Sequence, residues 1–303
     1  MDWSDYTYDR TWIFLRASVP VGGRVLTLYE EVHPLRCYGN AAVQKRFLRT
    51  VKALLPDGVQ PILVTDAGFI GPWFRAVTAL GWDYLGRIRQ NLLYQDAARQ
   101  EWQRCLSLYP KATRHPHYYG LIQLAKCHPV TCHLHLYHTP SKGRHKRTLA
   151  GQRSQRKVSN ANALRETSPW LVVTSLGPEH YPAKMIMQLY RTRMQIEQAF
   201  RDIKNTRSGF CLRQTRSRSL QRLANLLLIG MLASLVLWLV GRMAEQQKQH
   251  YQYQANSLKH RRVLSLFFLG QECLKQFYFK WRAHYFNHAL QLLHSDMKQQ
   301  IYP

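Results

Sequence analysis

The spacing of hydrophobic residues along the first part of the chain changes between the period of a strand and that of a helix. Residues 11 to 31 contain two runs rich in β-branched and aromatic residues around Gly22 and Gly23, which predicts a β-hairpin. Residues 40 to 55 carry apolar residues at the spacing of an amphipathic helix, with Asn40 as its N-cap. A sheet therefore begins near the N-terminus, and a helix follows it.

The alternation continues beyond this helix. Residues 62 to 65 suit a short apolar strand, residues 72 to 80 a helix, and residues 84 to 88 a second strand. Asp66 directly follows the first of these strands. Strands that alternate with helices predict an α/β layer fold.

Three apolar segments organise the second half of the chain. They are a buried strand over residues 169 to 176, a long helix over residues 182 to 206 and an apolar helix over residues 220 to 245. The stretch before them, residues 89 to about 168, is polar and rich in His and Tyr, and it breaks the alternation.

Nineteen residues without a charge, 223 to 241, lie between Arg222 and Arg242 and are long enough for a transmembrane helix. The segment is the only one of its kind, and it contains Asn225 and Ser234. The central helix of a large soluble protein has the same pattern. We favour a helix buried on most sides and expect no membrane association; a single-span membrane protein is the alternative.

Basic residues greatly outnumber acidic ones. In 303 residues, 43 Lys and Arg stand against 17 Asp and Glu, for a formal net charge of +26. Such an excess indicates a polyanionic partner, most simply nucleic acid. An anionic membrane surface or a ribosomal partner fits the charge equally well, so charge identifies the class of partner and not the activity.

One segment is especially basic. Residues 142 to 157 hold seven Lys or Arg together with Gly143 and Gly151, which indicates a mobile loop. Such a run is usually solvated, but the charge of the whole chain makes contact with DNA phosphates an equal expectation. The residues expected to contact DNA here are Lys142, Arg144, Lys146 and Arg147.

Six cysteines are scattered through a chain that shows no secretory signal, which predicts reduced thiols in a cytoplasmic protein. Cys127 and Cys132, with His133, His135 and His138, could be drawn as a zinc site. The gap between the two cysteines is at the wide end of the usual range, and no second pair stands at zinc-knuckle spacing. We interpret the segment as an ordinary strand and keep zinc as the alternative.

Residues 189 to 209 combine a hydrophobic face with a polar stripe. On a continuous helix, four side chains fall within roughly 60° of one another: Tyr190, Arg193, Glu197 and Lys204. Arg193 and Glu197 alone could be an ordinary surface ion pair. That interpretation does not explain why a phenol and an ammonium join the same stripe.

Two further carboxylates stand where an α/β sheet presents its ligands. Asp66 follows a buried strand, and Asp2 would have the equivalent place on a neighbouring strand if residues 1 to 5 end a strand. Glu197 would approach from the helix over the sheet. Divalent ions held by such oxygen ligands stabilise the attacking and leaving oxygens of phosphoryl transfer, so the three acids suggest that chemistry.

The polar stripe resembles Y-x2-R-x3-E-x6-K, the signature of the insertion-sequence-four family of bacterial DDE transposases. The segments DWSD at residues 2 to 5 and TDAGF at residues 65 to 69 are similar to those that carry the family's two aspartates. The resemblance covers nearly the whole chain, and the signature is highly specific.

The resemblance implies an α/β fold with a ribonuclease-H-like (retroviral-integrase-like) catalytic core, a β-rich insertion and a C-terminal helical region. The first part of the core would be residues 1–88, the insertion with its basic loop 89–168, the remainder of the core 169–210 and the helical region 211–303.

The resemblance also implies a metal site and an activity. Asp2, Asp66 and Glu197 would be the catalytic residues and the ligands of two Mg²⁺ ions, with Mn²⁺ as a substitute. The activity would be cut-and-paste DNA transposition, in which an endonuclease step, a hairpin at the transposon end and strand transfer take place at one site.

By the same resemblance, Tyr190, Arg193 and Lys204 would contact phosphates near the transposon end. Trp170 would be the aromatic platform on which a flipped base stacks, although a core tryptophan at a strand start would look the same. The partners would be the inverted-repeat ends and the target DNA. A homodimer would hold the ends together in a synaptic complex on the bacterial nucleoid.

Family members carry a helical N-terminal region and an apolar half-strand before the first aspartate, and this chain starts at Met1 without them. We therefore expect a truncated transposase whose activity is in question, because Asp2 has almost no strand to hold it. An in-frame extension in the upstream DNA would indicate a misassigned start.

Two other functions stay open. One is a ribonuclease-H-like nuclease or resolvase with the same metal chemistry and no strand transfer. The other is a non-catalytic DNA-binding fragment.

Overall fold

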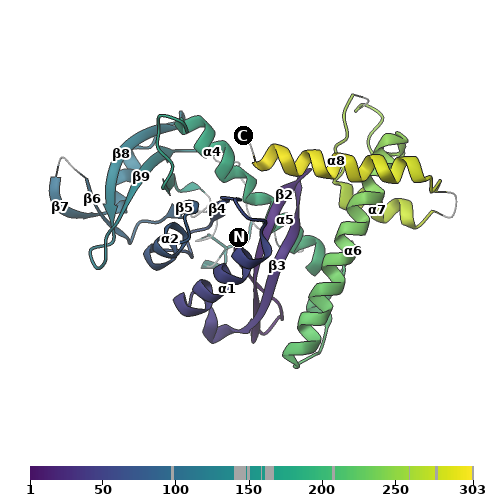
Figure 1. Ribbon diagram of the computed structural model, residues 1–303, viewed down its shortest axis with the longest axis horizontal. Coiled ribbons are helices and arrows are strands. Elements are labelled where there is room, and N and C mark those ends of the chain that lie inside the picture. Colours follow the sequence, from purple (N-terminus) through teal and green to yellow (C-terminus); the bar gives the residue numbers. More distant parts are fainter. Residues whose placement is uncertain are drawn as a thin grey trace. The chain divides into compact units, whose positions relative to one another are not determined.

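The computed structural model describes residues 1–96, 99–139, 148, 151–157, 159–160, 167–206, 209–258, 260–276 and 279–301 (Figure 1). The chain divides into two compact units. Unit 1 comprises Met1–Pro56 and Thr192–Pro303, and unit 2 comprises Asp57–Arg191.

Unit 1 contains a three-stranded antiparallel sheet in the order β1-β2-β3. Its strands are β1 (Asp2–Asp5), β2 (Trp12–Val21) and β3 (Arg24–Pro34). Gly22 and Gly23 join β2 to β3 with φ values of 57° and 87°, a backbone conformation that glycine adopts without steric cost. The predicted hairpin is confirmed.

The described helices of unit 1 all follow this sheet in the sequence. They are η1 (Leu35–Cys37), α1 (Ala41–Leu54), α5 (Met194–Lys204), η3 (Leu212–Gln214), α6 (Leu220–Gln246), η4 (Gln249–Tyr253), α7 (Leu266–Leu274) and α8 (Ala283–Ile301). The side chain of Asn40 accepts hydrogen bonds from the N–H groups of Ala42 and Val43, so the predicted N-cap of α1 is confirmed.

Two hydrophobic clusters hold unit 1 together. In the first, Phe14 of β2 packs against Phe200 of α5 and Leu223 of α6. The second joins α6, α7 and α8. Helices α6 and α7 approach closely, and Gly241 allows this because it has no side chain. A Cβ at this position would lie 2.1 Å from the carbonyl oxygen of Leu266.

Helix α6 is less buried than its sequence predicts. It is the one described helix whose length and hydropathy would suit a membrane span, and 39% of its most apolar window is buried. Four apolar side chains that share one face of α6 are about half exposed: Leu228, Ile229, Leu232 and Val236. The expectation of burial on most sides is wrong because the described elements pack on other faces of α6 and leave this one exposed.

Unit 2 contains a seven-stranded mixed sheet in the order β4-β5-β10-β9-β8-β6-β7. Its strands are β4 (Ile62–Thr65), β5 (Asp83–Ile88), β6 (Leu93–Asp96), β7 (Arg99–Arg104), β8 (His117–Leu124), β9 (Val130–Tyr137) and β10 (Trp170–Thr174). Strands β4 and β5 are parallel, and the other pairs are antiparallel. The strands predicted over residues 62 to 65, 84 to 88 and 169 to 176 are confirmed.

The described helices of unit 2 are α2 (Gly71–Thr78), η2 (Cys105–Lys111) and α4 (Ala183–Thr192). Helix α4 packs Ile186, Met187 and Tyr190 against Leu85 of β5 and Val172 of β10. With strands and helices in both units, the α/β class is confirmed.

The structure corrects two expectations. The helix predicted over residues 182 to 206 is two helices, α4 and α5, which are separated at Arg193. The described ladders also place Asp2 and Asp66 in different sheets, since β1 pairs with β2 and β4 pairs with β5. Within the described ladders, the two carboxylates therefore do not share a sheet.

Candidate active site

Asp2 is the first residue of β1, whereas the sequence suggested that it ends a strand. It lies opposite Arg16 of β2 in the antiparallel ladder and is only 8% exposed. Its Oδ1 accepts a hydrogen bond of 2.9 Å from the backbone N–H of Trp3. Strand pairing and this bond together fix the direction of the carboxylate.

Arg193 joins Asp2 to Glu197. Its Nη1 donates to Oδ2 of Asp2 at 3.2 Å, and its Nη2 donates to Oε1 of Glu197 at 2.6 Å. The side chains of Arg193 and Asp2 are each 11% exposed, and that of Glu197 is 34% exposed. Two carboxylates from distant parts of the sequence thus converge on one guanidinium; we call this set of three residues the bridged site.

Lys204 ends α5 and reaches back to β1, where its Nζ donates to Oγ of Ser4 at 2.5 Å. The ammonium also lies 5.6 Å and 5.4 Å from the ring centres of Phe14 and Phe200. Burial, followed by the positive charge of Arg213, lowers the pKa of Lys204 to about 8. The partner Ser4 was not identified from the sequence, because nothing in DWSD indicates which residue a lysine two hundred positions away will meet.

A second arginine lies close to this group in a closed environment. Arg16 donates from Nε and Nη2 to the same oxygen of Glu30, at 2.9 Å and 2.6 Å, and the side chains are 3% and 8% exposed. Its guanidinium also lies over the rings of Phe14 and Phe200. Sequence reasoning missed this pair, although an arginine within the apolar run of residues 12 to 21 was a usable signal.

In unit 2, Asp66 directly follows β4, as predicted. Its Oδ1 accepts a hydrogen bond of 2.8 Å from the N–H of Gly68, which forms a local turn. Phe69, which is fully buried, anchors the turn against Trp73. The carboxylate is therefore held at the end of a strand and half-buried.

Trp170 opens β10 within an aromatic group. Its ring lies 5.9 Å from that of Tyr137 and 5.1 Å from that of Tyr190, edge to face in both cases. Tyr190 is 3% exposed and belongs to the core of unit 2. Tyr190 is thus a core residue on α4 in unit 2, whereas Arg193, Glu197 and Lys204 belong to unit 1.

The remaining expectations concern the basic loop and the His-rich segment. Lys142, Arg144, Lys146 and Arg147 lie outside the described residues. The predicted strand around His133 and His135 is confirmed as β9. His135 is fully buried, and this burial lowers its pKa to about 4, so the imidazole is neutral at pH 7. Among the residues with described positions, no group of three or more His, Cys, Asp or Glu is arranged to hold a metal ion.

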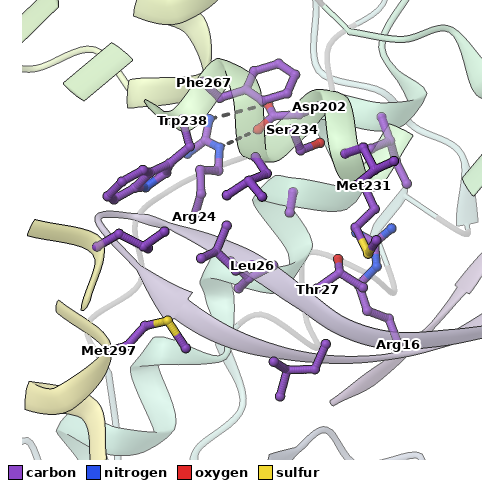
Figure 2. Close-up of a pocket in the computed structure, with 17 residues that line it drawn as sticks. Arg16, Arg24, Leu26, Thr27, Asp202, Met231, Ser234, Trp238, Phe267 and Met297 are labelled. Atoms are coloured by element: carbon purple, nitrogen blue, oxygen red, sulfur yellow. Dashed lines mark hydrogen bonds and ion pairs between the residues drawn. The ribbon is translucent and has the colours of Figure 1, made fainter. Parts of the chain in front are cut away.

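Unit 1 also encloses a cavity of about 240 Å³ between β2, β3, α5, α6, α7 and α8 (Figure 2). Most of its lining is apolar and includes Trp238, Phe267 and Met297. Figure 2 shows Arg24 directed toward Asp202, with which it forms an ion pair. Burial raises the pKa of Asp202 although Arg24 opposes that effect, so the pair belongs to the interior of the unit and not to the bridged site.

The fold and the site define an α/β protein that gathers carboxylates on a cationic side chain. The family model for the transposase DDE domain matches residues 25–236. Because this range is more than half of the chain, the chain belongs to the transposase DDE domain family. No curated protein matches the chain.

Membership supports a transposase function and DNA binding, and enzymes of this family generally use divalent metal ions. Asp66 and Glu197 lie within the matched residues, and Asp2 precedes them.

Proposed function

We propose that the chain is a cut-and-paste DNA transposase of the insertion-sequence-four type, similar to the transposase of insertion sequence ten, with a ribonuclease-H-like core. The observation that carries the proposal is the bridged site. Asp2 and Glu197 are remote in the sequence but bind the same guanidinium in a chain of the DDE family.

We propose Asp2, Asp66 and Glu197 as the ligands of two Mg²⁺ ions, with Mn²⁺ as a substitute. Carboxylate oxygens are the donors that these hard cations prefer, and two of the three already converge on a positive charge. When bound, the ions would stabilise charge on the attacking and leaving oxygens of a phosphodiester. The chain itself would orient the carboxylates through β1, α5 and the turn after β4.

Tyr190, Arg193 and Lys204 would bind DNA phosphates, and the basic loop would add further contacts. Lys204 supports this role because a partly buried ammonium loses less of its interaction with phosphate to solvent. Trp170 would stack on a flipped base, and its two edge-on tyrosine neighbours would hold its ring in place.

The proposal extends to the organisation of the active protein. The core would comprise residues 1–88 and 169–210, the β-rich insertion 89–168 and the helical region 211–303. A homodimer would hold two transposon ends in a synaptic complex in the bacterial cytoplasm, at the nucleoid.

The test is Mg²⁺-dependent cleavage of DNA that carries the inverted repeats flanking the gene. We expect hairpin-ended products from the chain and none from Glu197→Gln or Asp66→Asn. A matched control is Asp57→Asn, which removes an exposed acid of the same unit as Asp66. Precut ends mixed with a supercoiled target distinguish a transposase from a nuclease, because only a transposase joins the two DNAs. DNA binding without metal-dependent cleavage would favour the non-catalytic fragment.

A further inference from the structure

Arg193 has a position that its proposed contact with phosphate does not require. It follows the last residue of α4 and precedes the first residue of α5, and it lies between two carboxylates. A residue that only bound DNA would not need to engage both proposed metal ligands.

We propose that Arg193 is an internal counter-cation that competes with the divalent ion for Asp2 and Glu197, and so sets the affinity of the metal site. This inference rests on the proposed function, because it concerns the same site. It adds a positioning role for Arg193 before metal binds.

The hydrogen bonds of Asp2 support competition. One carboxylate oxygen accepts from the N–H of Trp3, and the other accepts from Arg193. A divalent ion bound to Asp2 must therefore share or replace one of these bonds. The side-chain donor is the one that can move, since the N–H of Trp3 belongs to the paired strand β1.

The balance of charge points the same way. Two carboxylates share one guanidinium, and the ammonium of Lys204 also acts on Asp2, so a divalent cation would meet positive charge already present at the site. Arg193 and the ion repel each other, and each favours the same two carboxylates. Metal binding should therefore weaken the bridge, after which the guanidinium is available for a bidentate contact with phosphate.

The bridge is open to solvent on the side of Glu197. Arg193 has φ −53° and ψ −32° but lies in the turn between the two helices. Glu197 is one turn into α5, and its side chain is 34% exposed, so the open side of the bridge faces solvent there.

The experiment measures the binding of Mn²⁺ alone to the full chain, through the loss of the electron paramagnetic resonance signal of free Mn²⁺. We expect Arg193→Gln to bind Mn²⁺ about tenfold more tightly than the parent chain, within the usual range of coupling between sites. Arg193→Lys keeps the charge but lacks the forked guanidinium that binds two carboxylates, so its affinity for Mn²⁺ should lie between those of the parent chain and Arg193→Gln.

Arg213→Gln is the matched control. Arg213 is in the same unit, its guanidinium is 3.9 Å from Asp5 of β1, and it contacts neither carboxylate of the bridge. Removing its charge should change Mn²⁺ affinity by about twofold at most, as expected for a partly exposed pair.

Glu197→Gln separates the possible results. If it abolishes the site while Arg193→Gln and Arg193→Lys bind no more tightly than the parent, the metal site stands and the competition is disproved. If Glu197→Gln leaves Mn²⁺ binding unchanged in every background, the proposed metal site fails and the competition fails with it. Circular dichroism verifies the folding of each variant. If Arg193→Gln does not fold, the Mn²⁺ affinity of Arg193→Lys tests the competition instead.

Discussion

Unit 1 contains two arginine sites of opposite design. Arg16 pairs with one carboxylate, that of Glu30, and both side chains are almost fully buried. Arg193 is shared by Asp2 and Glu197, one of which is one-third exposed. The first site is closed and joins one arginine to one carboxylate, and the second is open on one side and shares one arginine between two carboxylates.

The difference shows how a structural ion pair can be told from a functional one in a single fold. In a buried pair, the two opposite charges neutralise each other and attract no further ion. Removal of either partner leaves an uncompensated charge in the interior. The bridged site differs because two carboxylates share one guanidinium and the side chain of Glu197 is partly exposed, so another cation can reach it.

The largest effect is expected at the closed pair. Arg16→Met should lower the free energy of unfolding by about 3–5 kcal/mol, because it leaves Glu30 buried without its cation. Urea denaturation measures the loss. The double variant Arg16→Met/Glu30→Leu should recover most of it; a single variant as stable as the parent chain would mean that the pair is solvated.

Glu197→Gln should affect activity and not stability. The amide can still accept from Arg193, but the lost charge should reduce Mg²⁺-dependent cleavage by about a hundredfold to a thousandfold, as for other removals of a charge-stabilising group. Gel analysis of the cleaved ends gives the rate. A large fall in the melting temperature would show instead that the bridge is structural, as in the closed pair.

Lys204 should make stability depend on pH. Its pKa is about 8 in the folded chain, against an ordinary value of 10.5, so the unfolded chain binds more protons between these values. The free energy of unfolding should therefore rise from pH 8 toward pH 10.5, by on the order of 1 kcal/mol after solvent screening.

The measurement is urea denaturation at several pH values for the parent chain and for Lys204→Met. The difference between the two should change over this range. A difference that stays constant would mean that the Lys204 ammonium is as well solvated in the folded chain as in the unfolded one.

The smallest effect is expected at an exposed pair. Arg10 and Asp5 lie 3.2 Å apart with side chains that are 62% and 32% exposed. Arg10→Gln should change the free energy of unfolding by less than about 0.5 kcal/mol. A change comparable to that of Arg16→Met would mean that burial does not separate the two classes of pair.

Local patterns predicted much of the fold. The hairpin at Gly22 and Gly23, the helix capped by Asn40 and the strand before Asp66 depend on residues close in sequence, and the structure confirms each. The break at Arg193 carries no such signal, because no Pro or Gly interrupts the helical pattern and the backbone of Arg193 stays in the helical region. The sequence also could not predict which face of α6 is buried, since a helix that is apolar on every side shows no preferred face.

The site was predicted only as a set of residues. Spacing brought Arg193 and Glu197 together because they are one helical turn apart. That Arg193 also binds Asp2, or that Lys204 meets Ser4, depends on partners about two hundred residues away. The convergence of Asp66 with the other two acids stays a prediction.

The sequence by itself determined the α/β class, the position of most strands and helices, and the acidic and basic residues on which a DNA-processing site could depend. These follow from periodicity, capping and charge, which act over a few residues. Only the tertiary structure decided which carboxylate shares which arginine and which pair is closed to solvent. Ion pairing and desolvation depend on distances of a few ångströms between side chains, and those distances exist only once remote segments have packed.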